Sequence, residues 1–286
     1  DDYVFGLQRT LDPKTASIYA YLLYVIKGGQ PVNEGQAPLS ALGVRALDPL
    51  TLEIRLEHPA PYLPELTKHQ SFFPAPKHVV EKYGDGWVKP GRMVSNGPFR
   101  LTAWRLGDRI TVEKNPWFWD AARVCLDRVN FYPTPDVVSA ERRVARGELD
   151  VNTRFQSNRY ERLKTTLPGV ARANVSLATA YLSFNTRDVA AFRDIRVRRA
   201  LSMTIDRDFI TAKLMRAGQQ PAYSFVPPVT ANYVKPGAGP RLRWADMPFA
   251  QRQTEARKLL AQAGFTPKRP LKFTILAANN TDTLLL

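Results

Sequence analysis

One stretch, residues 94–116, constrains the fold of this chain more than any other, because it contains every part of a β-hairpin. Apolar and polar residues alternate over Phe99–Ala103, and the alternation resumes over Ile110–Val112. Gly107-Asp108 lies between these runs and supplies a tight turn. Asn96-Gly97-Pro98, before the first run, is also turn sequence, since glycine adopts positive φ and proline fixes the entry to the strand. We therefore expect two antiparallel strands here.

Helical and strand periodicity alternate along the rest of the chain, which is typical of an α/β fold. Apolar spacing and capping residues (Asp136, Asp194 and Asp206) predict helices at 1–12, 19–26, 77–83, 136–146, 158–167, 193–201, 205–218 and 249–264. The first of these has no N-cap before it, and another helix opens at Thr281. A period of two predicts a hairpin at 42–58 and strands at 72–76, 126–132, 147–151, 170–185 and 271–276.

The composition is that of a soluble globular protein. Its 286 residues suffice for one large or two ordinary domains, and 44% hydrophobic with 23% charged residues excludes a disordered chain. Apolar runs are too short to span a membrane. Asp1-Asp2 does not begin a signal peptide, which indicates a mature or trimmed chain and leaves the compartment open. The single cysteine, Cys125, cannot form an internal disulfide or a cysteine metal cluster, and its apolar neighbours predict a buried, inert thiol.

The net charge of +15 first suggests nucleic acid or an anionic surface as a partner. The basic residues are unevenly spread, however. Residues 1–76 carry 6 basic and 8 acidic side chains (net −2), residues 77–177 carry 18 and 11 (net +7), and residues 178–286 carry 17 and 7 (net +10). Because the arginines are scattered among acids and apolar residues, we interpret them as a solvated surface, with an anionic ligand or partner as the alternative.

No pattern typical of catalysis or of metal binding is present. The three histidines lack metal-ligand spacing, and there is no Gly-x-Ser-x-Gly or phosphate-binding loop. Asp206 and Asp208 flank a helix start, where capping explains both. Trp117-Phe118-Trp119 has the composition of a base-stacking surface, but a place in the core or in the wall of a cleft is the preferred interpretation. We expect no catalytic residues, no metal and no cofactor, so the protein is predicted not to be an enzyme.

Several phrases carry a resemblance to a known family. Ser95-Asn96-Gly97-Pro98-Phe99, followed by Glu113-Lys114-Asn115-Pro116-Trp117-Phe118-Trp119, resembles the signature of the periplasmic solute-binding proteins of ABC importers, and the oligopeptide-binding branch is the nearest match. The further matching phrases are Asp12–Tyr19, Gly147–Asp150, Arg198–Leu201 with Asp206-Arg207, and Pro221–Pro228.

The resemblance implies a periplasmic-binding-protein-like α/β fold, with mixed sheets in lobes joined by a hinge. Residues 1–76 would form part of a small accessory lobe, 77–177 part of the first large lobe, and 178–286 the beginning of the second. The chain would be an internal fragment, truncated at both ends.

The function implied is capture of oligopeptides outside the cytoplasm for import by an ABC transporter. The expected partners are a peptide and the inner-membrane permease, without nucleic acid, and the protein would be a monomer in the periplasm or tethered at the cell surface. Dipeptide, murein peptide, nickel and sugar binders share these phrases and remain alternatives. An anionic-surface or nucleic-acid binder is the alternative from another class.

The resemblance implies that seven residues face the ligand: Tyr19, Thr153, Arg154, Phe155, Tyr181, Ser183 and Asn185. Tyr19 could equally be an ordinary helix anchor, and residues 153–155 an exposed loop. The sequence departs from well-known oligopeptide binders at Ala178, where they often have a disulfide cysteine, and at Ser183, where some have an acid. The second departure favours an uncharged or acidic peptide over a cationic one.

Overall fold

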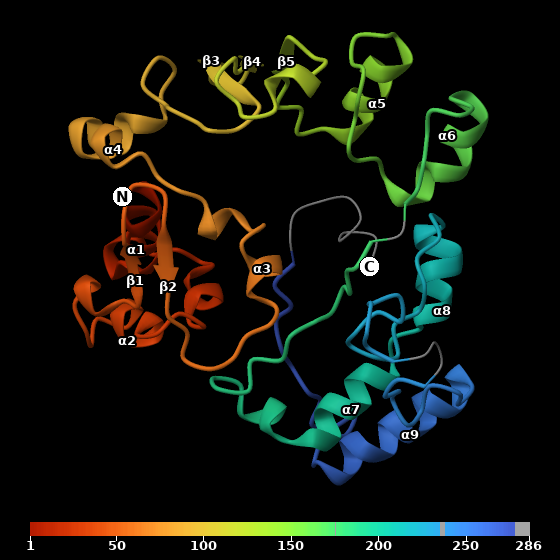
Figure 1. Ribbon diagram of the computed structural model, residues 1–286. Coiled ribbons are helices and arrows are strands. Elements are labelled where there is room, and N and C mark those ends of the chain that lie inside the picture. Colours follow the sequence, from red (N-terminus) through yellow and green to blue (C-terminus); the bar gives the residue numbers. More distant parts are fainter. Residues whose placement is uncertain (175, 235–237, 278–286) are drawn as a thin grey trace. The chain divides into compact units, whose positions relative to one another are not determined.

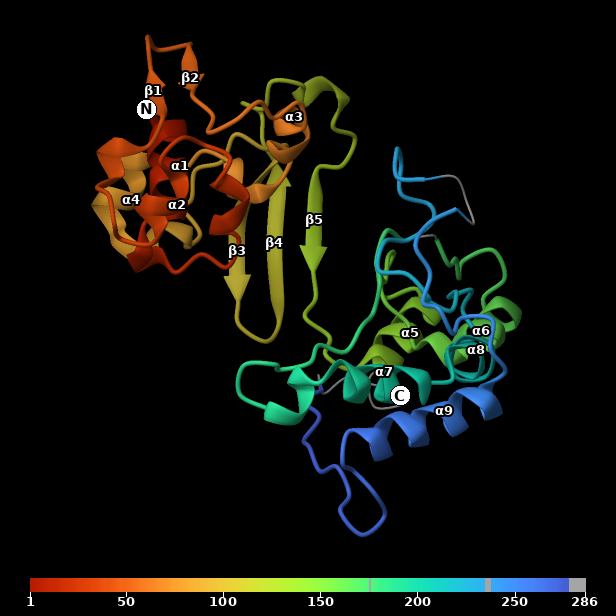
Figure 2. The same cartoon turned by 90° about the horizontal axis from the view of Figure 1, so that it is seen from below.

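The computed structural model describes residues 1–174, 176–234 and 238–277 (Figures 1 and 2). The chain divides into two compact units, an N-terminal unit of Asp1–Pro133 and a C-terminal unit of Thr134–Leu286. Each contains helices, and two sheets lie in the N-terminal unit, so the predicted α/β class is confirmed. In the described residues, every strand pair is antiparallel. The lobe boundaries predicted at residues 76 and 177, and the mixed sheets, stay predictions.

The N-terminal unit is built on helix α1 (Asp2–Leu11), whose inner face packs against α2 (Gly29–Asn33) and the segments around it (Figure 1). The buried side chains of this core are Leu7, Leu11, Ala20, Leu23, Val25, Ile26, Val32, Leu42, Val44, Ala60 and Phe72. Apolar residues at helical spacing on α1 thus form one side of the core, as the sequence predicts.

The helix predicted at 19–26 is wrong. Only a short 3₁₀ helix forms, at Ala20–Leu23. The chain then pairs with residues 55–57, because Lys27 N donates to Arg55 O at 2.8 Å and Glu57 N donates to Val25 O at 3.0 Å. β-branched Val25 and Ile26 suit such pairing better than a helix interior. Tertiary pairing therefore overrides the helical spacing of the apolar residues.

The hairpin predicted at 42–58 is confirmed. Strand β1 (Val44–Ala46) pairs with β2 (Leu52–Ile54), with Val44 opposite Ile54 and Ala46 opposite Leu52. The turn between them is held by Asp48, whose Oδ1 accepts hydrogen bonds from Leu50 N and Thr51 N at 2.8 Å. This side-chain-to-backbone pattern is the reason aspartate begins so many turns.

The hairpin at 94–116 is also confirmed, and it is part of a three-stranded sheet. Strand β3 (Phe99–Arg105) pairs with β4 (Arg109–Lys114), which pairs with β5 (Arg128–Phe131), close to the strand predicted at 126–132 (Figure 2). Gly107 has φ +72°, which the tight turn requires and an L side chain would resist. The period-two pattern and the turn residues were sufficient to locate both strands.

Asn115 joins the two halves of the signature phrase that surrounds this hairpin. Its side chain is 3% exposed, and Nδ2 donates to Ser95 O at 3.1 Å and to Gly97 O at 2.9 Å. Its Oδ1 accepts from Trp117 N at 3.1 Å. Both polar atoms of a buried amide are therefore satisfied, and the turn before β3 is fixed to the end of β4.

Helices α3 (Leu63–Leu66) and α4 (Lys77–Tyr83) follow the first hairpin, and α4 has the predicted bounds. The strand predicted at 72–76 does not form. Pro74 and Pro76 have no N–H to donate to a neighbouring strand. This segment is instead fixed to the start of α1, since Ala75 N donates to Asp2 O and Lys77 N donates to Asp2 Oδ1.

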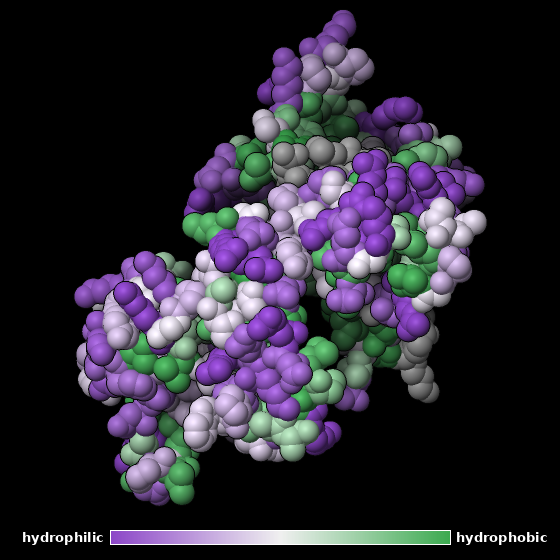
Figure 3. All heavy atoms as spheres, turned by 90° about the horizontal axis from the view of Figure 1, so that it is seen from above, coloured by the Kyte–Doolittle hydropathy of each residue, from purple (hydrophilic) through white to green (hydrophobic). Residues whose placement is uncertain are grey.

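The prediction of a buried Cys125 is wrong, and for Trp117 and Trp119 the core is excluded, while a place in the wall of a cleft stays a prediction. Cys125 is exposed, because its apolar neighbourhood lies in an irregular segment between a 3₁₀ turn and β5 and not in a packed element. Trp117 and Trp119 are 88% and 84% exposed, so neither lies in the core of the unit. Hydrophobic residues at the molecular surface form separate patches among hydrophilic ones (Figure 3).

The C-terminal unit is helical in the residues described. Its helices are α5 (Val137–Ala145), α6 (Tyr160–Thr166), α7 (Ile195–Met203), α8 (Arg207–Phe209), which continues as a π-helix over Ile210–Met215, and α9 (Phe249–Gln262). Helices α7 and α9 lie side by side (Figures 1 and 2) and bury Ala200, Met203 and Ala256 between them. None of the described helices is long and apolar enough to cross a membrane.

The predicted N-caps of these helices are confirmed. Asp136 accepts from Ser139 N at 2.8 Å, Asp194 from Arg196 N at 2.8 Å, and Asp206 from Phe209 N at 3.1 Å. Gly264, with φ +86°, follows the end of α9 as expected.

The strands predicted at 147–151, 170–185 and 271–276 do not form in the described part of these ranges. Alternation shows only that a segment could have one apolar face, whereas a strand also needs a hydrogen-bonding neighbour. No described strand pairs with these three segments. The helix predicted from Thr281 lies outside the described residues.

Candidate functional site

The segment Tyr181–Asn185 is the most open of the predicted ligand-facing segments. Between Tyr181 and Phe184, the main chain makes no hydrogen bond to the backbone of any described residue. Tyr181 and Leu182 are 65% and 60% exposed, and Ser183 is exposed beside them. Backbone N–H and C=O groups must be paired somewhere or solvated. Its main-chain donors and acceptors thus have no backbone partner among the described residues and can pair with a chain that lies along the segment.

Side-chain packing fixes this segment at both ends. The ring of Tyr181 lies 5.2 Å from that of Phe225, and Thr179 Oγ1 donates to Phe225 O at 2.9 Å. At the other end of the segment, the ring of Phe184 lies 5.2 Å from that of Phe192. The exposed backbone is therefore held in place although it belongs to no sheet.

Asn185 lies in the turn that ends the segment. Its Nδ2 donates to Asp188 Oδ2 and its Oδ1 accepts from Asp188 N, both at 3.0 Å. Hydrogen bonds from Arg187, and after it from Asn185, lower the pKa of the Asp188 carboxyl. The amide of Asn185 is thus already committed within the chain, so its side chain is less available to a ligand than that of Ser183.

The loop 153–155 is the second segment that the resemblance turns toward the ligand. Asn152 shapes it, because its Nδ2 donates to Arg154 O at 2.5 Å and its Oδ1 accepts from Arg154 N at 3.4 Å. Thr153 and Arg154 are exposed. Phe155 stacks on Tyr160 at 5.4 Å with an angle of 17° between the rings. The loop offers an exposed guanidinium beside a fixed aromatic pair.

Tyr19 belongs to the N-terminal unit and is neither fully exposed nor buried. Its ring meets the edge of His69 at 4.8 Å, and the side chain is 37% exposed. Such a contact fixes the direction of the ring and leaves part of it open. The helix that Tyr19 was predicted to enter is absent, since the residue precedes the short 3₁₀ turn.

The seven predicted residues therefore lie on three separate stretches of chain. Tyr181, Ser183 and Asn185 share one segment, and Thr153, Arg154 and Phe155 share another in the same unit. Tyr19 lies in the N-terminal unit. Their common role at one ligand stays a prediction.

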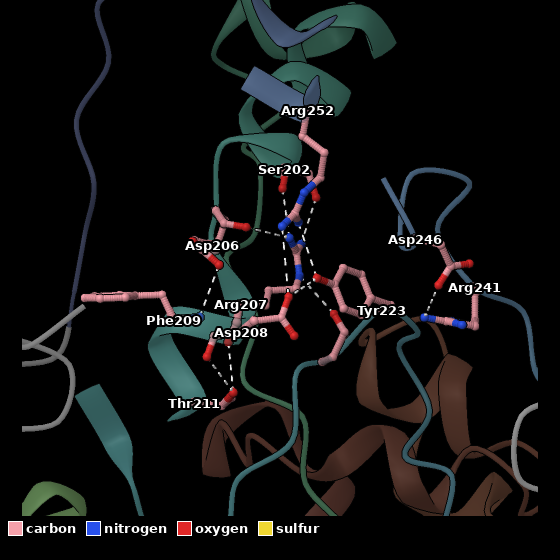
Figure 4. Close-up of polar contacts among 12 residues, drawn as sticks. Ser202, Asp206, Arg207, Asp208, Phe209, Thr211, Tyr223, Arg241, Asp246 and Arg252 are labelled. Atoms are coloured by element: carbon pink, nitrogen blue, oxygen red, sulfur yellow. Dashed lines mark hydrogen bonds and ion pairs between the residues drawn. The ribbon is translucent and has the colours of Figure 1, made fainter. Parts of the chain in front are cut away.

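A polar cluster that the sequence did not predict lies beside α8 (Figure 4). Tyr223 donates its hydroxyl hydrogen to Asp208 Oδ2 at 2.8 Å, and Arg252 Nη1 donates to the same Tyr223 oxygen at 3.3 Å. Arg252 is 3% exposed, and its Nη2 lies 4.0 Å from Asp208 Oδ2. Asp206 is the N-cap of α8, as predicted, and Asp208 lies in the first turn of that helix. Asp208 also binds Tyr223 across the loop, a contact that its place at the helix start did not predict.

Arg207 completes this cluster and holds the loop main chain. It donates to Ser202 O and Ala222 O at 2.9 Å, and to Ile205 O at 3.3 Å. Burial lowers the pKa of Arg207, while burial, followed by the hydrogen bond to Asp208, raises the pKa of Tyr223. The partners of Arg252 lie far away in sequence, so only the Asp206–Asp208 phrase could have indicated the cluster.

Neither the cluster nor the predicted ligand-facing segments have the layout of a metal centre. The described residues contain no group of three or more His, Cys, Asp or Glu side chains that could hold a metal ion. His58 contacts Tyr62, and His69 contacts Ser71 and Tyr19. The arrangement offers free main-chain groups and aromatic surfaces, which suit binding of an extended polar chain.

Comparison with known proteins gives a consistent result. The family profile described as "Bacterial extracellular solute-binding proteins, family 5 Middle" matches residues 1–285. The chain is 39% identical over 280 residues to the periplasmic oligopeptide-binding protein OppA of Salmonella typhimurium, which covers 96% of this chain and 50% of that protein. It is 37% identical over 277 residues to the periplasmic murein peptide-binding protein MppA of Escherichia coli, again 96% of this chain and 50% of that protein.

Solved structures of related proteins match this chain with comparable identity and coverage. OppA of Burkholderia pseudomallei superimposes with a TM-score of 0.87 at 34% identity, over 94% of this chain and 53% of that one. OppA of Haemophilus influenzae in complex with RPPGFSPFR gives 0.85 at 33% identity, over 95% and 53%. The chain thus spans about half the length of the proteins it matches.

Proposed function

The chain belongs to the bacterial extracellular solute-binding proteins of family 5, and from this premise we propose that the full-length protein captures oligopeptides for an ABC importer. The proposal is supported by two relatives whose names include oligopeptide or murein peptide binding, and by a similar structure that holds the peptide RPPGFSPFR. The role is binding and transport, not catalysis.

The observation that carries the proposal is the main chain of residues 181–184, which has no backbone partner among the described residues. An extended peptide that lies beside it gains main-chain hydrogen bonds, as an added strand would. Such bonds read the peptide backbone and leave its side chains to pockets around it, so many sequences are accepted. Tyr19, Thr153, Arg154, Phe155, Tyr181, Ser183 and Asn185 are the proposed ligand contacts.

Capture would use the lobes predicted from the sequence, at 1–76, 77–177 and 178–286. Closure of large lobes about a hinge removes water from a bound ligand and creates the shape that a transporter can recognise. The proposed partners are the peptide and the inner-membrane permease. The proposed location is the periplasm or the outer face of the membrane, with the protein as a monomer.

Binding of nucleic acid is disfavoured by how the arginines are used. Many are paired within the chain, for example Arg45 with Glu53, Arg159 with Glu141 and Arg196 with Asp194. Binding driven by phosphates weakens steeply as salt rises, whereas a peptide held by main-chain bonds should be affected little. A salt titration of peptide and DNA binding by the full-length protein separates the two alternatives.

The test of the main proposal is mass spectrometry of ligands that co-purify with the full-length protein, followed by calorimetry with trialanine. Peptides in the purified protein and saturable trialanine binding are expected. A protein free of peptides that gives no heat with trialanine or longer peptides would overturn the proposal.

Ser183 allows a sharper test of ligand preference. Without an acid at this position, trialanine should bind more tightly than trilysine. Ser183→Asp should shift the preference toward trilysine, because a carboxylate attracts the ammonium groups. Ser176→Asp places the same charge elsewhere on the segment, at another exposed serine, and should leave the preference unchanged. Tighter trilysine binding by the unaltered protein would show that Ser183 does not set the preference.

A further inference from the structure

A hollow of about 400 Å³ lies in the C-terminal unit between α7 and the loop before α9. Arg198, Arg199 and Ser202 line it from α7, and Arg241, Arg243 and Trp244 line it from the loop. None of these belongs to the proposed peptide contacts. The hollow has the volume of a small-molecule site, which is typically 300 Å³ or more.

Two of the four arginines are already engaged, and two are not. Arg198 donates to Phe192 O and Arg193 O, and Arg241 pairs with the exposed Asp246 at 3.1 Å (Figure 4). Arg199 and Arg243 are exposed and form neither a hydrogen bond through the side chain nor an ion pair with any described residue.

The acids near the hollow do not balance this charge. Asp246 is paired with Arg241, and the carboxylate of Asp194 is bonded to Arg196 at 2.6 Å. Among the described residues, the lining of the hollow therefore keeps an excess of positive charge. Two free guanidinium groups across one hollow are suited to bind phosphate or carboxylate oxygens in pairs.

Neutral donors add to the guanidinium groups. Ser202 Oγ accepts from Arg207 Nη2 at 2.9 Å, so its own hydroxyl hydrogen remains available as a donor (Figure 4). Trp244 Nε1 is buried and has no hydrogen-bond partner among the described residues. A buried donor without an acceptor is costly and rare in folded proteins, and it points to an acceptor from outside the described residues, a place that a bound anion can take.

The remaining lining residues are apolar. Ile195, Leu242 and the indole of Trp244 contribute carbon surface to the hollow. A bare inorganic anion would leave this surface unused. We propose that the hollow binds a small organic anion, with a phosphate or carboxylate group held by Arg199 and Arg243 and an apolar body against Leu242 and Trp244.

The experiment is calorimetry of the full-length protein with three probes at constant ionic strength: phenyl phosphate, inorganic phosphate and benzyl alcohol. Phenyl phosphate should bind most tightly, inorganic phosphate more weakly and benzyl alcohol not measurably. Arg199→Gln with Arg243→Gln should weaken phenyl phosphate binding roughly tenfold or more, because two charge-assisted contacts are lost.

The matched control is Arg162→Gln with Arg257→Gln, which removes the same charge from exposed helix positions outside the hollow. It should bind phenyl phosphate as the unaltered protein does. In NMR spectra, the indole N–H signal that disappears in Trp244→Phe should shift on addition of phenyl phosphate. Equal weakening in both double variants, or saturation without a shift of that signal, would overturn the proposal. Trialanine binding should be the same in both double variants, so failure here is distinct from failure of the peptide proposal.

Discussion

Different interactions stabilise the interior of each of the two units. The N-terminal unit encloses a cluster of 11 buried hydrophobic residues, whereas the cluster between α7 and α9 in the C-terminal unit has three. In their place, arginines of the C-terminal unit bind main-chain carbonyls. Arg193 donates to Thr186 O and Arg187 O, and Arg207 reaches three carbonyls.

The way in which the arginines are used helps to explain why net charge is uneven along the chain. In the N-terminal unit, Arg45 and Arg55 share the carboxylate of Glu53, and Arg128 pairs with Glu113. Arginines of the C-terminal unit also pair with carboxylates, as Arg159 does with Glu141, but several bind carbonyl oxygens as well. A carbonyl oxygen satisfies a guanidinium without adding a negative charge. Residues 178–286 carry 17 basic and 7 acidic side chains, and part of this excess, for example Arg193, Arg198 and Arg207, is occupied by carbonyl oxygens within the fold. Net charge alone says little about a partner when arginines are used in this way.

The largest effect should come from the apolar core of the N-terminal unit. Leu23 is 0% exposed, so Leu23→Ala should lower the free energy of unfolding by about 2–5 kcal/mol through lost contacts and the cavity left behind. Urea unfolding of the full-length protein measures it. Leu50→Ala, at a residue 98% exposed, should change the value by less than about 0.5 kcal/mol. Equal effects of the two changes would contradict the assignment of the core.

Variants of Arg207 test whether carbonyl-binding arginines stabilise the C-terminal unit, as the apolar core stabilises the N-terminal unit. Arg207→Met keeps the apolar stem and leaves three carbonyls without this donor, those of Ser202 and Ile205 at part-buried bonds and that of Ala222 at an exposed one. The expected loss in the free energy of unfolding is about 1.5–3 kcal/mol. Arg207→Lys should recover less than half of it, because one ammonium cannot reach all three oxygens. The control is Arg257→Met, at an exposed arginine. If Arg207→Met lowered the free energy of unfolding no more than this control, the contrast between the units would be contradicted.

Tyr223→Phe should have a smaller effect, about 0.5–1.5 kcal/mol, because one hydrogen bond to Asp208 is lost. Its signature is pH dependence. Burial raises the pKa of Tyr223, so its contribution to stability is complete below the unfolded pKa of about 10 and is lost as pH rises through the higher folded value. The unaltered protein should therefore lose stability above pH ~10 more steeply than Tyr223→Phe. Identical alkaline slopes would show that Tyr223 is not buried.

The smallest effect should come from Asp194, the half-buried N-cap of α7. The hydrogen bond from the Arg196 side chain, and after it that from Arg196 N, lowers the pKa of Asp194. A lowered folded pKa contributes stability above the unfolded value of about 3.9, and this is lost as pH falls below it. Asp194→Asn should remove that part of the acid sensitivity while keeping a capping side chain. Acid titrations followed by circular dichroism that coincide for both proteins would contradict this.

Local sequence patterns predicted the parts of the fold that local interactions determine. The turn at Gly107, the cap at Asp136 and the stop at Gly264 each depend on a residue and its immediate neighbours. The segment 19–26 depends instead on residues 55–57, whose pairing no helical spacing could indicate. Burial of Cys125 was mispredicted for the same reason, because the apolarity of neighbours does not say whether a segment packs against anything.

The sequence predicted which segments belong to the candidate site, but not the contacts that their residues make. The resemblance selected Tyr181–Asn185, and the structure adds that the main chain of residues 181–184 has no backbone partner among the described residues, while the amide of Asn185 is committed to Asp188. The Arg252–Tyr223 contact joins residues 29 positions apart, and the hollow combines α7 with a loop some forty residues later. Such contacts are decided by packing of distant elements, on which a single sequence carries no information.

The position of Asn115 has a chemical consequence for the life of the protein. Exposed asparagines deamidate when the backbone nitrogen of the next residue attacks the side-chain amide, and the amide becomes a carboxylic acid. At Asn115 the next residue is Pro116, which has no N–H, so this route is closed. Conversion there would replace a donor with a carboxylate facing the oxygens of Ser95 and Gly97. The residue that fixes the hairpin entrance is thereby protected from deamidation by its own neighbour.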